Sequence, residues 1–496
     1  MLVNRGPSTG TLVMNTNEIL GFRRLSVVDT SVRGNQPFAA DGAKLLCNGE
    51  IYNHSSLEYV HGLDTYSESD CECIVHLYKK LGLDLTVNIL NGVFAFAIMT
   101  ETGVHFARDR TGVRPLFYGT TNSGNFAMAS YARALQDYCT EVYHVPPGWG
   151  TYDFATKKLT FSKYNYPVLK FDLSFDDIQK SVRDTLEGAV KDRLMSDRPL
   201  GCLLSGGLDS SIIASILCRL MGPDKVRTYS IGMVGSDDLR YARQVAEHLG
   251  TDHTEVVFTP EEGLRSIPDV IRDLESYDIT TIRASVGMWL LAKHISEHTD
   301  DIVLFSGEGS DELFCGYMYF HHAPTFEALE KESRRLVNDL YLYDVLRADR
   351  CISSHGLELR VPFLDRRMID LCFSMDGSVK APRRNFEKFV LRQAFETYLP
   401  RAVTWRRKDG FSDGVSGQEK TWYEHIAEFA DTKVSDAEFE AQASEFPSKE
   451  AMYYRQIYNS LFPRYQPDYK YWLPKWVDHG GNPSGRVVPG FTTTAE

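Results

Sequence analysis

Residues 204–211 have the composition of a phosphate-binding loop. Their sequence is LSGGLDSS, after a short apolar run and before a stretch with helical spacing. Glycines let the backbone approach an anion, and the free N–H groups at the start of a helix point toward it. Asp209 has a side chain suited to a magnesium ion that bridges phosphates. An ordinary Gly-Ser turn with a capping aspartate is the alternative, and the position between a buried strand and a helix favours the phosphate loop.

Two further segments are expected to reach the same crevice. Residues 230–232 end one predicted strand, and residues 306–312, of sequence SGEGSDE, end another. In open α/β sheets, ligands bind beyond the carboxyl ends of the strands. Ile231 is placed to touch an adenine face. Glu308 and Asp311 supply carboxylates whose repulsion requires a cation or a hydroxyl-rich ligand, and a solvated acidic turn is the weaker alternative.

A residue pattern that this loop lacks indicates which phosphate bond of ATP would be broken. It does not carry the Gly-Lys-Ser/Thr ending of a Walker A motif, so transfer of the γ-phosphoryl group is the less favoured use of ATP. The octapeptide resembles instead the PP-loop of ATP pyrophosphatases. These enzymes split ATP between its α- and β-phosphates and adenylate a carboxylate or a similar oxygen.

The first part of the chain, to about residue 164, predicts a sheet-dominated α+β unit. Gly-rich breaks separate its short apolar runs, which lie at 44–47, 92–99 and 104–107. Helical spacing is seen around 71–80 and is otherwise sparse.

The second part, from residue 174, predicts a parallel sheet with helices on both faces. Helical stretches are expected at 176–194, 211–221 and 239–249. Buried strands are expected at 200–204, 226–231 and 302–306. The remainder to about residue 476 has a mostly helical pattern, and residues 477–496 have the composition of a loose tail.

Bulk properties exclude several classes of protein. A chain of 496 residues is too long for a single core. The net charge of −13 argues against a nucleic-acid partner, which needs a basic face. No apolar run reaches membrane-spanning length, and the start does not resemble a signal peptide. The nine scattered cysteines are read as thiols in a reducing compartment, so a cytoplasmic protein is expected.

Long motifs in the second part resemble those of glutamine-dependent asparagine synthetases. These motifs are ESYDITTIRAS at 275–285, SGEGSDEL at 306–313, LRADR at 346–350, GLELRVPFLD at 356–365 and WRRKDGFSDG at 405–414. In the last of them Asp409 stands where the family usually has Glu. The resemblance spans nearly the whole chain, including the aromatic residues between 469 and 476.

The resemblance implies an α/β PP-loop ATP pyrophosphatase domain over residues 174–476 that uses ATP and Mg²⁺. Aspartate would be adenylated to β-aspartyl-AMP, and ammonia would then give asparagine, AMP and pyrophosphate. Glu308 would orient or deprotonate the ammonia, and Lys408 would neutralise the leaving pyrophosphate; a surface lysine is the alternative for Lys408. Arg283 and Asp344 are weaker candidates for the aspartate side. The resemblance implies that AMP is bound by Leu204, Ile231, Ser306 and Gly307. It implies that pyrophosphate is bound by Ser205, Gly206, Gly207, Asp209, Ser210 and Ser211. The implied magnesium ligands are Asp209 and Asp311.

Residues 1–165 resemble a class II glutaminase, an Ntn-hydrolase-like α+β domain. The matching motifs are RGP at 5–7, RLSVVD at 24–29, NGEIYN at 48–53, SDCE at 69–72 and RDRTGVRPL at 108–116. A small departure is Tyr131, where the family usually has Glu. Asn48 and the Gly49 amide would form the oxyanion hole. The implied glutamine ligands are Arg24, Leu25, Ser26, Val27, Val28, Asn48, Gly49, Glu50 and Asp70.

The family's N-terminal cysteine nucleophile is absent from this sequence. Such enzymes begin with a Cys whose own α-amino group is the base, whereas this sequence begins MLVN and reaches Arg5 at once. Cys47 beside the oxyanion asparagine lacks a terminal amine and is read as a core thiol. Either the protein uses free ammonia or the natural chain starts upstream; the complete glutamine-binding set favours the second explanation.

Two other functions remain open. A β-lactam-synthetase-like enzyme would adenylate a carboxylate and close a ring, but the motifs match asparagine synthetases more continuously. A non-catalytic scaffold that binds ATP or glutamine is disfavoured by the retained Asp209, Glu308, Asp311 and Lys408. The family resemblance also suggests a homodimer, with small molecules as the other partners.

Overall fold

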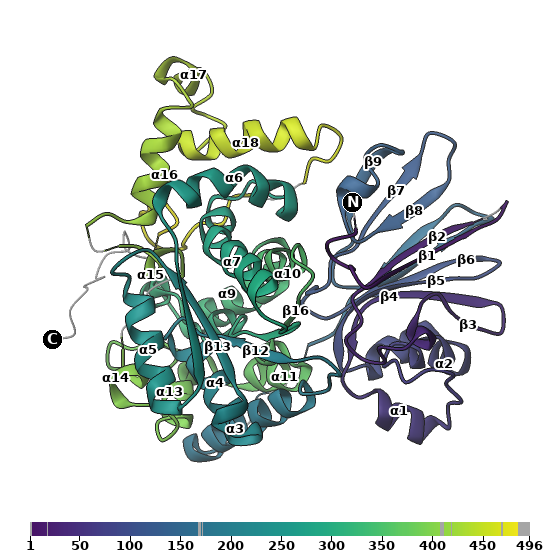
Figure 1. The fold of residues 1–496 in the computed structure, drawn as a ribbon, viewed down its shortest axis with the longest axis horizontal. Coiled ribbons are helices and arrows are strands. Elements are labelled where there is room, and N and C mark those ends of the chain that lie inside the picture. Colours follow the sequence, from purple (N-terminus) through teal and green to yellow (C-terminus); the bar gives the residue numbers. More distant parts are fainter. Residues whose placement is uncertain are drawn as a thin grey trace.

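The structure is a computed structural model that describes residues 2–16, 18–166, 170, 172–406, 411–417, 419–467 and 470–484. Antiparallel sheets make up its first part and a parallel sheet with many helices its second, and the two parts lie side by side (Figure 1). Lys408 lies outside the described residues, so its predicted role has no structural counterpart here.

The first part is built on antiparallel sheets. The six-stranded sheet has the order β11-β10-β6-β5-β4-β3, with β1-β2 and β8-β7-β9 as smaller sheets. The strands are β1 (Thr9–Met14), β2 (Ile19–Arg24), β3 (Phe38–Ala40), β4 (Ala43–Ile51), β5 (Gly92–Met99), β6 (Gly103–Arg108), β7 (Phe117–Thr121), β8 (Phe126–Ala129), β9 (Cys139–His144), β10 (Gly148–Asp153) and β11 (Leu159–Ser162). Helices α1 (His54–His61) and α2 (Cys73–Ile89) accompany them. A hydrophobic core between this sheet and the two helices contains Leu45, Ile74 and Phe96.

The second part contains the predicted parallel sheet, in the order β14-β13-β12-β15-β16. Its strands are β12 (Leu200–Leu203), β13 (Arg227–Gly232), β14 (Asp252–Val257), β15 (Val303–Phe305) and β16 (Glu358–Arg360). The longer helices are α3 (Phe175–Asp192), α4 (Leu208–Met221), α5 (Asp237–Leu249), α6 (Pro260–Leu274), α7 (Ile279–His298), α9 (Phe326–Asp339), α10 (Asp344–Ser353), α16 (Trp422–Asp431) and α18 (Lys449–Leu461). The shorter ones are α8 (Ser310–Leu313), α11 (Arg366–Ser374), α12 (Gly377–Lys380), α13 (Phe389–Ala394), α14 (Arg401–Thr404), α15 (Phe411–Gly414) and α17 (Asp436–Glu440).

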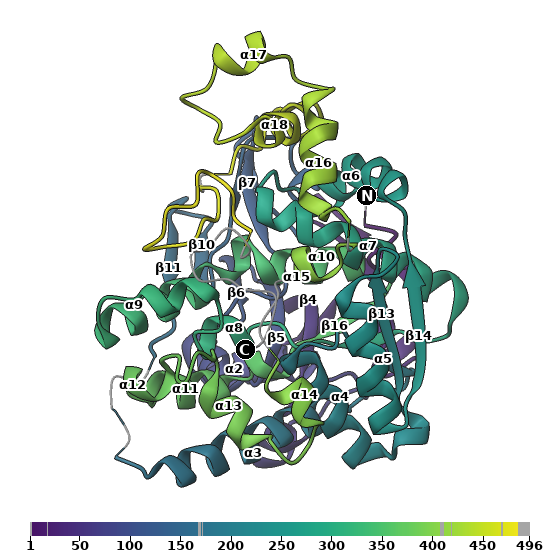
Figure 2. The ribbon, with the colours of Figure 1, turned by 90° about the vertical axis from the view of Figure 1, so that its left-hand side faces the viewer.

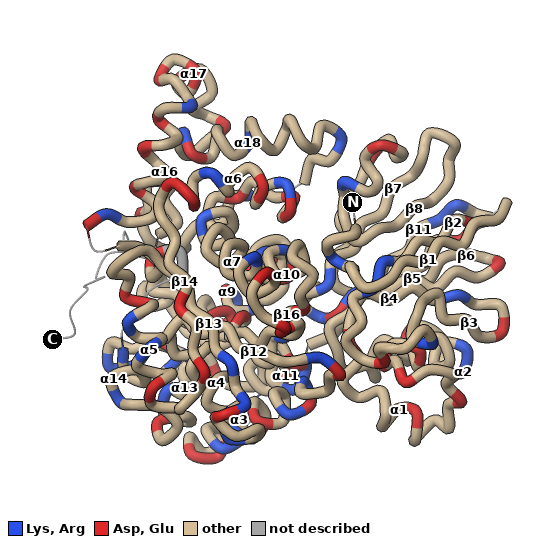
Figure 3. Tube along the Cα trace, in the orientation of Figure 1, with Lys and Arg blue, Asp and Glu red and all other residues tan. Residues whose placement is uncertain are grey.

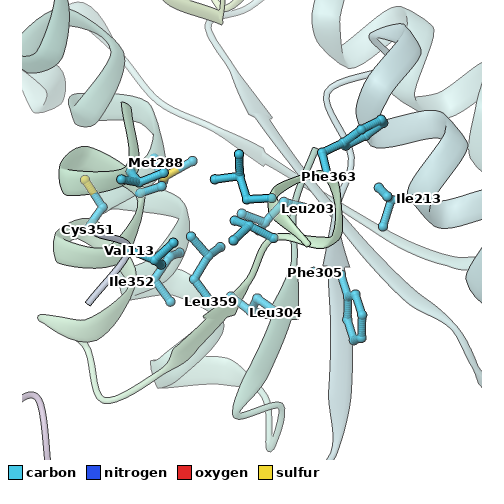
Figure 4. Close-up of a cluster of buried hydrophobic side chains, with 14 of the residues drawn as sticks. Val113, Leu203, Ile213, Met288, Leu304, Phe305, Cys351, Ile352, Leu359 and Phe363 are labelled. Carbon is cyan, nitrogen blue, oxygen red and sulfur yellow. The ribbon is translucent and has the colours of Figure 1, made fainter. Parts of the chain in front are cut away.

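Helices cover both faces of the parallel sheet, as its buried strands require. Leu304 lies on the side of Met288 and Ile352, which belong to α7 and α10, while the adjacent Phe305 lies toward Ile213 of α4 (Figure 4). This alternation follows from the two-residue period of a strand. The turned view shows the strands between these helix layers (Figure 2).

The two parts of the chain share one continuous core. Val113 from the first part packs in the same buried cluster as Ile352 and Leu359 from the second (Figure 4). Buried ion pairs reinforce the contact: Asp349 on α10 accepts hydrogen bonds from Arg5 and Arg114 at 2.7–2.8 Å. These contacts hold the antiparallel sheets of the first part against the parallel sheet and helices of the second part.

Basic and acidic residues are interspersed along both parts of the trace (Figure 3). Among the described residues, no helix is long and apolar enough to span a bilayer. All nine cysteines are buried and none forms a disulfide.

Candidate active site

The predicted phosphate loop connects the end of β12 to the start of α4. Gly206 adopts φ +68°, and a Cβ there would lie 2.4 Å from the backbone nitrogen of Ala242 in α5. Only glycine therefore suits this position. Gly207 is the N-cap of α4 and no described side chain caps the helix, so its first N–H groups face the cavity. A helix start of this kind attracts anions.

A second loop, between β15 and α8, packs directly on the first. A Cβ at Gly307 would lie 2.8 Å from the backbone nitrogen of Ser210, so glycine is needed for this approach. The Ser310 hydroxyl donates a hydrogen bond to Asp209 at 2.7 Å. The two loops thus form one rigid wall of a single cavity.

Most residues predicted to bind nucleotide line this cavity, together with the predicted catalytic Glu308 and the predicted metal ligand Asp311. Those that line it are Leu204, Ser205, Gly207, Asp209, Ser210, Ile231, Ser306, Gly307, Glu308 and Asp311. Gly206 and Ser211 support the loop instead: the carbonyl of Gly206 accepts a hydrogen bond from Arg406, and the Ser211 hydroxyl donates to the carbonyl of Gly207 at 2.6 Å.

A buried cation holds the carboxylates at one end of the cavity. Arg347 donates to Glu308 at 2.8 Å and to Asp344 at 3.2 Å. Burial raises the pKa of Glu308, and Arg347 opposes that rise. Burial opposes the charge on Arg347, but Glu308 and Asp344 together raise its pKa. Glu308 is therefore fixed in place beside the nucleotide loop as a carboxylate with an elevated proton affinity.

A second carboxylate group lies behind Glu308. Burial, followed by the nearby Asp344 and Asp311, raises the pKa of Glu312 well above its usual value. The Tyr317 hydroxyl donates to Glu312 at 2.6 Å. This end of the cavity is acidic, and it favours a ligand that carries positive charge or hydrogen-bond donors.

The two weaker candidates for the aspartate side are placed differently. Asp344 lines the cavity. Arg283 does not: its guanidinium is held by Glu450 at 2.5–2.8 Å and donates to Asn482 at 2.8 Å. In this arrangement Arg283 anchors the C-terminal segment rather than facing the cavity.

Several cavity residues were not predicted as site residues. They are Lys388 and Arg392 at α13, Arg406 after α14, Tyr317 after α8, and Trp472, Pro474 and Pro483 from the C-terminal segment. Arg406 lies in the motif at 405–414, and Trp472 and Pro474 lie in the aromatic segment at 469–476, but no role was assigned to them there; the other residues lie in none of the motifs described above. A loose tail was predicted at 477–496, but its first part, residues 477–484, packs against the protein. There the Ser484 hydroxyl donates a hydrogen bond to Asp413 at 2.8 Å. Residues 485–496 lie outside the described part.

A second cavity lies in the first part of the chain. Nearly all residues predicted to bind glutamine line it, namely Arg24, Leu25, Val27, Val28, Asn48, Gly49, Glu50 and Asp70, while Ser26 does not. Ser26 is buried and its N–H group donates to Ser8. Arg24 is engaged with the backbone carbonyls of Val28 and Ser31, so it orders the cavity wall.

The polar groups of this second cavity are strongly perturbed. Burial, Asp70 and Glu358 raise the pKa of Glu50 well above its usual value. Burial also raises the pKa of Asp70 to about 6, although the Ile51 N–H group donates to it. Cys47 lines the cavity and is buried, and the Gln36 side chain bonds both its N–H group and its carbonyl. Titratable groups whose pKa values are strongly shifted inside a cavity mark a candidate functional site.

Comparison with known proteins identifies the family. The "Asparagine synthase" family matches residues 181–335 and 325–477, and the "Glutamine amidotransferase domain" family matches residues 1–146. The glutamine-hydrolyzing asparagine synthetase of Gallus gallus is 40% identical over 524 residues, covering 97% of this chain and 93% of the relative. The chain belongs to the asparagine synthetase family.

Other relatives agree with this assignment. The glutamine-hydrolyzing asparagine synthetase of Homo sapiens is 40% identical over 523 residues, with 97% of this chain and 93% of the relative covered. Among solved structures, the allosteric regulatory enzyme of purine biosynthesis matches 52% of this chain and 76% of its own at 15% identity with a TM-score of 0.29.

Proposed function

We propose that this member of the asparagine synthetase family makes asparagine from aspartate, ATP and ammonia. The observation that best supports this proposal is a single cavity. It is lined by the start of helix α4, the carboxylates of Asp209 and Asp311, and the Glu308–Arg347 ion pair. The start of helix α4 suits the binding of phosphates, and the Glu308–Arg347 pair suits the chemistry at a carboxylate. The 40% identity to glutamine-hydrolyzing asparagine synthetases over nearly the whole chain supports the same reaction.

In the first half-reaction, the β-carboxylate of aspartate attacks the α-phosphate of ATP and pyrophosphate leaves. Leu204, Ile231, Ser306 and Gly307 would hold the AMP moiety, because they line the side of the cavity formed by the strand ends. The N–H groups at the start of α4 would hold the pyrophosphate. Fixed donors of this kind stabilise the charge that develops on phosphate oxygens without reorganisation.

The residues fit the magnesium ion that the family uses. Asp209 and Asp311 lie on either side of one cation, the Lys388 ammonium, at 2.5 and 2.7 Å. The described part of the chain has no group of three or more potential metal ligands. Magnesium is usually bound by one or two carboxylates together with substrate phosphates, so these two carboxylates are sufficient. When bound, the ion would neutralise phosphate charge during adenylation.

In the second half-reaction, ammonia attacks the β-aspartyl-AMP carbonyl and AMP leaves. The attacking nitrogen must be neutral and must lose a proton as the bond forms. We assign this proton to Glu308, whose pKa is raised by burial and whose position is fixed by Arg347. A carboxylate with elevated proton affinity is the better base at neutral pH. Lys408 remains our proposal for a phosphate ligand outside the described residues.

We propose that the second cavity binds glutamine, the ammonia source of the family; release of ammonia from it also requires the cysteine nucleophile that this sequence does not contain. Glu50 and Asp70 would bind its α-amino group, and Asn48 with the Gly49 amide would stabilise the oxyanion. We retain residues 1–165 as the glutaminase-like domain, residues 174–476 as the synthetase domain and residues 477–496 as a C-terminal tail. We also propose a cytoplasmic homodimer; nine unpaired buried thiols suit a reducing compartment, and light scattering would test the assembly.

The deciding experiment supplies the purified protein with ATP, magnesium and aspartate, plus either ammonium chloride or glutamine. Asparagine and pyrophosphate with ammonium would support the synthetase proposal, and asparagine with glutamine would add glutaminase activity. Pyrophosphate release without aspartate would favour a ring-closing or other adenylating enzyme. A folded protein that binds ATP and releases no pyrophosphate would refute the enzyme and favour a scaffold.

A further inference from the structure

Lys388 is buried between the two carboxylates of the nucleotide cavity. Its Nζ atom lies 2.5 Å from Asp209 and 2.7 Å from Asp311, and its side chain is only 3% exposed. Lysine ammonium groups are seldom buried without a specific partner. This lysine joins the end of the phosphate loop to the end of the β15 loop, two segments about a hundred residues apart in the sequence.

The surrounding fold guides Lys388 to this position. A Cβ at Gly316 would lie 2.0 Å from the Lys388 Cε atom and 2.1 Å from Asp311 Oδ1, so the lysine stem passes directly over a glycine backbone. Lys388 itself adopts φ +54° at the start of α13. The preceding Glu387 is held by His321 at 2.6 Å. These features give the ammonium a fixed approach to the two carboxylates.

The position of the ammonium coincides with the place proposed for magnesium. Two carboxylates that face one another repel strongly in a buried site unless a cation lies between them. Lysine is suited to a temporary role there, since its compact charge sits on a flexible stem and can change partners. Arginine, with a rigid planar fork, is less suited to release both carboxylates.

We propose that Lys388 is an internal counter-ion that occupies the cation position between Asp209 and Asp311 until magnesium and nucleotide bind. It then releases the two carboxylates and pairs with phosphate oxygens. The proposal rests on the proposed function, because that function places magnesium and phosphates in this cavity. It makes Lys388 a positioning residue for the carboxylates in the free protein. A consequence is that the nucleotide-free protein binds a divalent cation weakly.

The test measures Mn²⁺ binding to the nucleotide-free protein by electron paramagnetic resonance. In Lys388→Met the carboxylates lose their ammonium, so Mn²⁺ affinity should rise by about tenfold or more, which corresponds to about 1.4 kcal/mol. Lys388→Arg keeps a cation in place and should remain close to the wild type. Equal Mn²⁺ affinity in wild type and Lys388→Met would overturn the proposal.

Two further variants test whether the change in Mn²⁺ affinity arises at Asp209 and Asp311. Lys449 provides a matched control, because its ammonium also bridges two carboxylates, Asp436 at 2.5 Å and Asp431 at 3.2 Å, on the exposed surface. Lys449→Met should leave Mn²⁺ affinity unchanged. The double variant Lys388→Met with Asp311→Asn should lose the gained affinity, since one carboxylate is gone. Persistence of the gain in this double variant would place the metal elsewhere and refute the proposal.

Thermal unfolding provides a second readout if Lys388→Met folds poorly. The proposal predicts that this variant is destabilised by carboxylate repulsion and that Mn²⁺ restores its melting temperature, because the metal replaces the ammonium. Loss of stability that Mn²⁺ does not restore would indicate a purely structural lysine. These measurements use neither ATP nor aspartate, so they are independent of whether the protein makes asparagine.

Discussion

Replacing Asp349 with asparagine should destabilise the contact between the two parts of the chain. Asp349 is fully buried on α10 and accepts three hydrogen bonds from Arg5 and Arg114, which come from the first part. Asparagine has nearly the same shape but no charge. The guanidinium groups of Arg5 and Arg114 would then lose their shared anion, and Arg114 would keep the carboxylate of Glu358 at 3.5 Å.

The size of the effect can be worked out from the pKa of Asp349. Burial acts against its charge, but Arg5 and Arg114 hold the pKa at about 2, compared with the usual 3.8. At 1.36 kcal/mol per pH unit, this difference is worth about 2.4 kcal/mol in favour of the charged form. Leaving a buried charge without its partner typically costs about 3–5 kcal/mol. We therefore expect Asp349→Asn to lower the free energy of unfolding by about 2–5 kcal/mol.

The assay is urea unfolding at pH 7, followed by circular dichroism and by tryptophan fluorescence. Asp300→Asn is the matched control, because Asp300 also pairs with an arginine, Arg227 at 2.5 Å, but is 73% exposed. An exposed pair contributes at most about 1 kcal/mol. A loss for Asp349→Asn no larger than that of Asp300→Asn would refute the reasoning.

The pH dependence of the Asp349 effect has a definite sign. Its pKa is lower in the folded than in the unfolded state, so its stabilisation is present above a pH of about 4. It is lost as the pH falls toward 2. The difference between wild type and Asp349→Asn should therefore shrink over this acidic range, and a difference that stays constant would contradict the assignment.

Three further predictions concern single residues of the two cavities. Glu308→Gln keeps its contact with Arg347 but cannot accept a proton, so asparagine formation should fall by about 100-fold or more while the melting temperature is nearly unchanged. Asp70→Asn should raise the free energy of unfolding at pH 7 by up to about 3 kcal/mol, because the pKa of folded Asp70 is about 6 and its burial as an anion is unfavourable. Gly206→Ala should lower stability by about 2 kcal/mol or more and weaken ATP binding, since its φ is +68° and its Cβ would clash with α5.

Each of these predictions has a distinct contradicting result. Unchanged asparagine formation in Glu308→Gln, measured by amino-acid analysis, would exclude a proton-accepting role. A stability gain in Asp70→Asn that persists at pH 4 would show that charge burial is not its cause, since Asp70 is largely protonated in the folded protein there. Wild-type ATP affinity in Gly206→Ala, measured by calorimetry, would mean that the loop tolerates a different backbone.

The parts of the fold that sequence predicted are those with strong local patterns. The strand and helix around the nucleotide loop were predicted correctly, and α4 begins at Leu208, three residues before the predicted start. The parallel sheet was predicted from the same alternation, which structure confirms. Local periodicity is a reliable signal where a strand is apolar on both faces or a helix has one apolar side.

Two strands that were not predicted from the sequence show where local patterns fail. β16 (Glu358–Arg360) was included in a region with a mostly helical pattern, yet it is a buried strand. Two of its three residues are charged, and they are buried because Arg360 donates to Glu358 at 2.8 Å. β14 (Asp252–Val257) lies at the sheet edge with mostly half-buried residues, so no apolar run marks it.

The same reasoning applies to the cavities. Residues on contiguous motifs, such as Asp209 and Glu308, were predicted because glycines and acids cluster near them in the sequence. Lys388 and Trp472 were not predicted as site residues, since neither lies near the glycines and acids of the loops and each reaches the cavity through packing. Sequence therefore identifies the loops that meet a ligand, while the cation and the wall opposite them depend on tertiary structure.

The C-terminal segment of the cavity has a consequence for biosynthesis. Trp472 and Pro483 line the same cavity as the loop at Ser205, roughly 270 residues earlier in the chain, which at usual translation rates corresponds to some 10–50 seconds of synthesis. The Trp472 backbone N–H group also donates to the buried Asp278 at 2.7 Å. A nascent chain thus exposes its nucleotide loop well before the opposite wall exists. Ligand-competent protein can therefore form only after the segment that contains Trp472 and Pro483 has left the ribosome.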